Sequence, residues 1–110
     1  MNDSQYNLIA DELLLAVEEA IEDSGIDIDY EGVGGLLTLT FKNGTKIIIN
    51  KQAPLHEIWV ATKFNGHHFT YKQSDDEKEQ WHDKRGGGEF WQFIAQAAST
   101  QADEDVILNR

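Results

Sequence analysis

The fold is decided by one stretch in the middle of the chain, Leu36-Leu37-Thr38-Leu39-Thr40-Phe41-Lys42-Asn43-Gly44-Thr45-Lys46-Ile47-Ile48-Ile49-Asn50. Within residues 36–42 alternate side chains are apolar, which is the period of a strand with one buried face. Asn43-Gly44 favours a tight turn between antiparallel strands, because both residue types tolerate positive φ. Residues 45–50 then predict the returning strand. The stretch predicts a hairpin and therefore an antiparallel sheet.

Strand patterns continue on both sides of this hairpin. Before it, residues 27–31 alternate acidic and apolar side chains, and three glycines at 32, 34 and 35 predict a loop. After it, Pro54 interrupts the pattern, residues 57–62 and 67–71 predict two further strands, and a short sixth strand is expected around Trp81. We therefore expect a sheet of five or six antiparallel strands.

A helix is predicted at each end of the chain. Residues 4–23 have helical periodicity, with Ser4 as the expected N-cap and Gly25 as the expected C-terminal stop. Residues 89–101 predict the second helix. The expected buried face of the first helix consists of Tyr6, Ala10, Leu13, Val17, Ala20 and Ile21. Two terminal helices on one face of an antiparallel sheet give an α+β, two-layer sandwich, formed by a single domain over residues 1–110.

The charge of the chain is concentrated at its N-terminal end. The net charge is −11, and the first 41 residues contain ten carboxylates but no Lys or Arg, whereas the rest is nearly neutral. Leu8 and Leu15 are expected to be exposed within this acidic region. Such a surface attracts multivalent cations or a basic protein, and it repels nucleic acid because phosphates require Lys and Arg.

The carboxylates of the first helix and first strand are expected to form one acidic surface if the strand is an edge strand beside the helix. Hard cations such as Ca²⁺, Mg²⁺, Mn²⁺ or iron prefer oxygen ligands of this kind. Without convergent geometry the affinity should be weak and the selectivity poor. A face that serves only solubility is an equally good interpretation of such a charge run.

Several classes of function lack support in the sequence. There is no cysteine, which excludes disulfides and thiolate chemistry, and there is no G-x-S-x-G or phosphate-binding loop. His67 and His68 are neighbours in a strand and should point to opposite faces. The lack of catalytic motifs favours a protein that is not an enzyme. We see neither a signal peptide nor an apolar segment long enough to span a membrane, so we expect a cytoplasmic location.

Trp59 is expected to point away from the helices. In residues 57–62, Ile58 and Val60 take the buried face, which leaves Trp59 on the uncovered face of the sheet. An outward Trp is a good anchor for a protein partner. The alternative is that it lies flat on its own sheet and shields the neighbouring strands. By contrast, Trp81 and Trp91 are expected in or near the core.

The run Asn50-Lys51-Gln52-Ala53-Pro54-Leu55-His56-Glu57-Ile58-Trp59-Val60 resembles the signature of the frataxin family. The preceding Gly34-Gly35-Leu36-Leu37-Thr38-Leu39 and the Phe90-Trp91 pair that opens the last helix match as well. The likeness covers almost the whole chain and is with the bacterial frataxins. One departure is Glu57, where the family usually has Gln, and this alters one polar contact of the sheet surface.

The resemblance implies a two-layer sandwich and a monomeric, non-catalytic, iron-binding accessory protein of iron–sulfur cluster assembly. It implies weak binding of Fe²⁺ or Fe³⁺, docking on the cysteine desulfurase, and contact with the cluster scaffold protein. A regulator that binds only protein, with incidental affinity for iron, is the alternative. The implied iron site, which we name the acidic ridge, consists of Glu18, Glu19, Glu22, Asp23, Asp27, Asp29 and Glu31, with Asp11 and Glu12 as outlying members. The implied partner-binding residues of the sheet are Asn50, Gln52 and Trp59.

Overall fold

A computed structural model describes residues 1–72, 80–86 and 88–108 of the chain. The elements, in order, are α1 (Asp3–Ser24), β1 (Ile28–Val33), β2 (Leu36–Phe41), β3 (Lys46–Gln52), the short 3₁₀ helix η1 (Ala53–Leu55), β4 (Glu57–Ala61), β5 (Gly66–Tyr71), β6 (Trp81–Asp83) and α2 (Phe90–Ala102). The six strands form one antiparallel sheet in sequence order, so β1 and β6 are its two edges.

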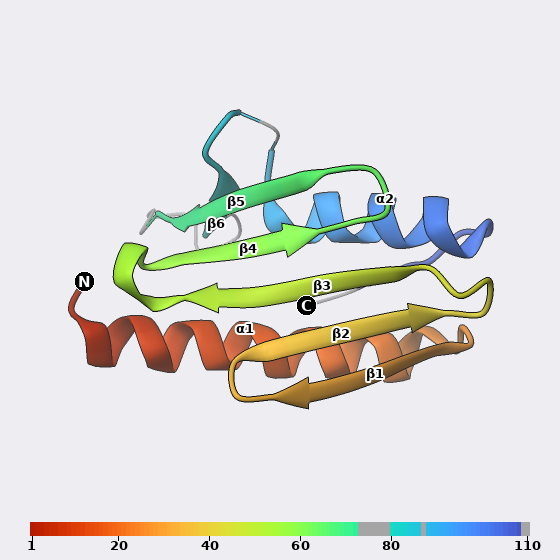
Figure 1. Ribbon diagram of the computed structural model, residues 1–110, viewed down its shortest axis with the longest axis horizontal. Helices are drawn as coiled ribbons and strands as arrows, with labels where there is room; N and C mark the ends of the chain where they lie inside the picture. The colour runs from red at the N-terminus through yellow and green to blue at the C-terminus, as the bar shows by residue number, and fades with distance from the viewer. Residues whose placement is uncertain (73–79, 87, 109–110) are drawn as a thin grey trace.

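Both helices lie behind the same face of this sheet, and the other face is uncovered (Figure 1). This confirms the predicted α+β sandwich. The buried face of α1 consists of the six residues that the periodicity predicts. Trp81 and Trp91 are buried, as expected. The C-terminal segment runs back between the helices, where Val106 and Leu108 are buried in the core and Ser99 Oγ accepts a hydrogen bond from the Val106 backbone N–H.

The ends of α1 show one wrong prediction and one confirmed prediction. The N-cap is Asn2 and not Ser4, because the Asn2 side chain accepts from the Gln5 backbone N–H while the Gln5 side chain accepts from the Asn2 backbone N–H. Gln5 can complete this reciprocal pair only when the cap lies three residues before it. At the other end, Gly25 has the left-handed conformation, with φ of 73°, that terminates the helix.

The register of the strands sorts side chains into rows across the uncovered face. One row joins Val33, Leu36, Asn50, Trp59 and His68, which are successive cross-strand partners from β1 to β5. A parallel row joins Gln52, Glu57, Thr70 and His82, from β3 to β6. Of the three predicted partner-binding residues, Asn50 and Trp59 therefore lie in the middle of the first row, and Gln52 lies at the end of the second.

No helix in the described part of the chain is both long enough and apolar enough to cross a membrane.

Candidate functional site

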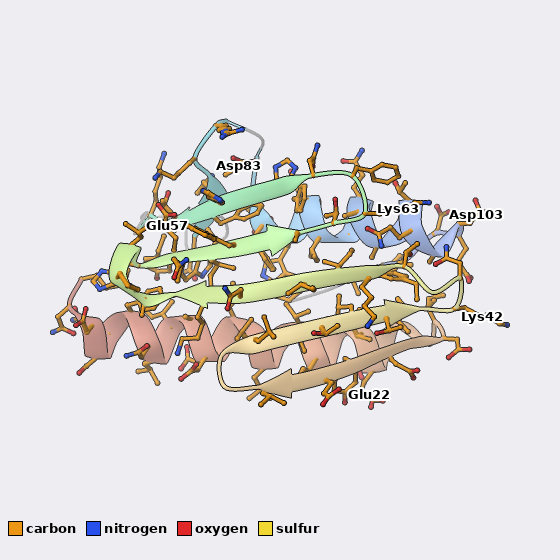
Figure 2. The ribbon with its side chains drawn as sticks, in the orientation of Figure 1. Glu22, Lys42, Glu57, Lys63, Asp83 and Asp103 are labelled. Atoms are coloured by element: carbon orange, nitrogen blue, oxygen red, sulfur yellow. The ribbon has the colours of Figure 1, made fainter. Side chains whose placement is uncertain are left out.

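Two carboxylates from the helical part of the acidic ridge, Glu18 and Glu22, lie along the edge strand β1. The Tyr30 hydroxyl donates a hydrogen bond of 2.8 Å to Glu22 Oε1. Glu18 Oε1 lies over Gly32, only 3.0 Å from where a Cβ of that residue would stand. Gly32 thus leaves room for the Glu18 carboxylate against the strand. Two ridge carboxylates therefore line the seam between α1 and β1, and Glu22 marks it at the edge of the sheet (Figure 2).

The strand part of the acidic ridge does not point toward α1. Asp29 and Glu31 pair with Thr40 and Thr38, whereas the intervening Tyr30 pairs with the buried Leu39 on the helix side. Because side chains alternate along a strand, Asp29 and Glu31 lie on the uncovered face. Asp27 precedes β1 and is exposed. The single continuous surface expected from the sequence is therefore replaced by a ridge that wraps around the edge of the sheet.

The two outlying carboxylates lie apart from this ridge. Asp11 pairs with Lys51 of β3, with 2.7 Å between Oδ1 and Nζ, so the protein already supplies a counter-charge for it. Glu12 lines a depression that also includes Tyr71 and Trp81, on the flank of α1 that faces β5 and β6. The structure thus separates Asp11 and Glu12 from the seam between α1 and β1.

The seven ridge carboxylates lack counter-charges from the described part of the protein. Within the described residues, none of them forms an ion pair, and the last turn of α1 contains no basic residue to offset the negative end of the helix dipole. Over residues 1–72, 80–86 and 88–108, no group of three or more Asp, Glu or His side chains is arranged to hold a metal ion. The surface is therefore suited to loosely held hard cations or to a basic protein, and it offers no preformed cage.

One shallow hollow lies on this surface, between α1 and β1. Its lining consists of Leu15, Glu18, Glu19, Glu22, Asp23 and Tyr30. The hydrogen bond to Glu22 raises the pKa of the Tyr30 phenol, with smaller contributions in the same direction from desolvation and from the charges of Glu22 and Glu18. Tyr30 therefore stays a neutral donor at neutral pH, and the negative charge of the hollow comes from its carboxylates.

Trp59 combines the two interpretations given above. It is on the uncovered face, but its ring lies flat on His68, with centroids 4.2 Å apart and an angle of 8° between the planes. Its Nε1–H donates a hydrogen bond of 2.7 Å to Glu57 Oε1. The side chain is half-buried as a result. Trp59 is thus held in one orientation, with one face of the indole on His68 and the other directed away from it.

The ion pair between the buried Glu57 and Lys84 was not predicted from the sequence. Glu57 lies on the uncovered face of the sheet (Figure 2), and its side chain is buried. Lys84 Nζ lies 2.8 Å from Glu57 Oε2. Burial by itself would raise the pKa of Glu57, but the hydrogen bonds from Lys84 and Trp59 and the positive charge of Lys84 outweigh it and lower the pKa. The only signal in the sequence was the departure from the Gln usual in the family.

The histidines are dispersed over the molecule. His67 and His68 point to opposite faces, as predicted. The ring of His67 packs against Phe93 of α2, and its Nδ1 lies 2.8 Å from Asp83 Oδ2. The ring of His68 stacks on Trp59 on the uncovered face. His56 stacks on the buried Tyr6, and its Nε2 lies 2.7 Å from Asp3 Oδ1. These contacts hold elements together and do not converge on one centre.

Comparisons with known proteins agree with this architecture. The family model described as a frataxin-like domain matches residues 1–104. An iron-sulfur cluster assembly protein CyaY of Colwellia psychrerythraea is 72% identical over 109 residues, covering 99% of this chain and 98% of that protein. A protein of the same name from Pseudoalteromonas atlantica is 56% identical over 110 residues, covering 100% of this chain and 97% of that protein. A solved frataxin of Psychromonas ingrahamii superposes with a TM-score of 0.88 at 46% identity, with full coverage of both chains.

The fold, the acidic first helix and the long matches in sequence point the same way, and the chain belongs to the frataxin family.

Proposed function

We propose that this protein is a non-catalytic accessory factor of iron–sulfur cluster assembly that binds iron weakly and docks on the cysteine desulfurase through its acidic ridge. The observation that carries the proposal is the set of seven carboxylates without an ion-pair partner among the described residues, gathered around the α1–β1 edge. The names of relatives that are 56% and 72% identical support the pathway. The carboxylates of such a surface repel one another, and a bound cation or basic partner would offset that repulsion.

The geometry supports weak rather than tight binding of iron. Carboxylate oxygens are suitable ligands for Fe²⁺ and Fe³⁺, but a tight site needs several of them to converge, and the ridge divides between α1 and the uncovered side of β1. A regulator that binds only protein remains the second candidate, and it is favoured by the absence of a metal-binding cluster among the described residues.

We expect titration with Fe²⁺ under anaerobic conditions to perturb backbone amide signals of α1 and β1 first, at micromolar or weaker affinity, because the highest density of carboxylates lies there. Mg²⁺ and Ca²⁺ should compete at higher concentration. The measurement is a two-dimensional NMR titration, with the residues of β3 and β4 as the internal reference. First effects centred on His67, His68 or His82 would contradict the assignment. If iron leaves desulfurase binding and the rate of cluster assembly unchanged, the protein-only alternative is favoured.

A second surface, the row that contains Asn50 and Trp59, is proposed to contact the cluster scaffold protein. Trp59→Ala should weaken scaffold binding by more than about 1 kcal/mol, as loss of an interface hot spot does. It should lower the free energy of unfolding by about 1–3 kcal/mol, less than the ~3–5 kcal/mol of truncating a fully buried Trp, because the ring is half-buried. Urea denaturation and calorimetric titration measure the two effects.

Trp59→Phe serves as the control for this prediction, since it keeps an aromatic ring for the stack on His68 while it loses the hydrogen bond to Glu57 and the smaller ring of the indole. If Trp59→Ala lowers the free energy of unfolding by more than about 4 kcal/mol, Trp59 contributes as much as a core residue does, and its role as an anchor is refuted. Unchanged scaffold binding in a folded Trp59→Ala protein would remove this surface from the proposal.

A further inference from the structure

Two leucines on α1 are exposed in the centre of its acidic, solvent-facing side. Leu8 is 63% exposed and Leu15 is 54% exposed, although both are in the middle of an otherwise regular helix. At 100° per residue they fall within about 20° of each other and nearly opposite the buried stripe of α1. Seven residues of helix separate them by about 10.5 Å along the axis. They therefore form a line of apolar side chains along the outermost side of the helix.

Carboxylates flank this line on both sides. Glu18 and Glu22 lie on the flank that faces β1, and Glu12, Glu19 and Asp23 lie on the other flank, as the same helical geometry requires. Next to Leu15, the hollow between α1 and β1 places Tyr30 among the carboxylates. Apolar surface within reach of several carboxylates fits an Arg or Lys side chain, whose methylene groups cover the apolar part while its charge meets the acids.

A leucine every seven residues is also the pattern of a helical dimer, but a second copy of this chain is a poor partner. Every charged residue that flanks the two leucines is acidic, and two such helices would bring like charges together. An anionic lipid surface is repelled for the same reason. The occupant that fits is a basic protein surface with apolar contacts at its centre and Arg or Lys at its rim.

We propose that Leu8 and Leu15 are apolar anchors of the surface that docks on a basic partner, so that binding depends on burial of these side chains as well as on charge. This inference rests on the proposed function, which takes the cysteine desulfurase as that partner. It predicts two separable contributions to affinity. The carboxylates set the salt dependence, while the leucines set an affinity that persists when salt screens the charges.

The test compares wild type, Leu8→Gln/Leu15→Gln and Leu55→Gln in calorimetric titrations with purified desulfurase at about 50 and 500 mM NaCl. Gln keeps helix propensity and has a similar length. Leu55 is a matched control, since it is 57% exposed but lies in η1. We expect the double variant to bind at least about tenfold more weakly at both salt concentrations, with an unchanged salt slope, and Leu55→Gln to bind like wild type. Circular dichroism melts should show all three proteins equally folded.

Three outcomes would overturn the inference in distinguishable ways. If the double variant binds the desulfurase as tightly as wild type does, the role of the leucines as anchors is refuted and the proposed docking stands. If wild type does not bind the desulfurase at either salt concentration, both the proposed docking and the role of the leucines are refuted. Sedimentation that shows a wild-type dimer and a monomeric double variant would assign the leucines to self-association.

Discussion

Replacing Glu19, Glu22 and Asp23 by Gln, Gln and Asn should weaken desulfurase binding by at least about 30-fold at low salt while raising the melting temperature by several degrees. Loss of charge pairs across an interface accounts for the first effect. The second arises because the three acids lie in the last two turns of α1, where the helix dipole disfavours negative charge, and α1 has no basic residue in its last turn. Gln at position 22 can still accept the Tyr30 hydroxyl hydrogen bond. Calorimetric titration and thermal melts measure the two effects.

The matched control for this variant is Asp103→Asn/Glu104→Gln/Asp105→Asn. It changes the net charge by the same amount and lies at the C-terminal end of the other helix, with all three side chains exposed. Asn tolerates the left-handed conformation of Asp103, whose φ is 57°. We expect the control to gain stability and to retain binding. Equal loss of binding in both variants would mean that only net charge matters, and a ridge variant that melts below wild type would show that these carboxylates make stabilising contacts.

Lys84→Met should lower the free energy of unfolding at neutral pH by about 1–3 kcal/mol, because it leaves the buried carboxylate of Glu57 without its counter-charge. The loss belongs at the lower end of this range, since the Lys84 side chain is 51% exposed and water screens the pair. The second substitution Glu57→Gln removes the stranded charge, keeps an acceptor for Trp59 Nε1–H, and should restore most of the lost stability. Urea denaturation of the two variants and of Glu57→Gln alone gives the coupling energy.

The pH dependence has a defined sign. The pKa of Glu57 in the folded protein is lowered from its ordinary 4.5, so its stabilising contribution is present above pH 4.5 and is lost as the pH falls through the folded pKa. In Lys84→Met, burial is no longer offset by the lysine and the pKa of Glu57 rises. The difference in stability between wild type and variant should therefore be largest near neutral pH and shrink below about pH 4.5. Lys42→Met, at the opposite end of the molecule (Figure 2), is the control and should show neither the loss nor the trend. A difference that stays constant with pH would refute the role assigned to the pair.

Much of the architecture could be predicted because local patterns in this chain agree with the global fold. The six buried residues of α1, the hairpin at Asn43-Gly44 and the outward side of Trp59 follow from helical and strand periods that need no knowledge of distant residues. The predicted N-cap was wrong because Ser and Asn are both favourable cap residues. The choice depended on which of Ser4 and Asn2 could form reciprocal hydrogen bonds with Gln5.

The sequence by itself determined the fold class, the acidic character of the first 41 residues and the family, since composition, periodicity and a long signature are properties of the chain alone. Only the tertiary structure decided which charged side chains form pairs and on which face the others lie. It gave Asp11 a partner in Lys51, turned Asp29 and Glu31 to the uncovered face of β1, and brought Lys84 to a buried Glu57. These outcomes depend on strand register and on contacts between residues 27 to 40 positions apart, and a local pattern holds no information about either.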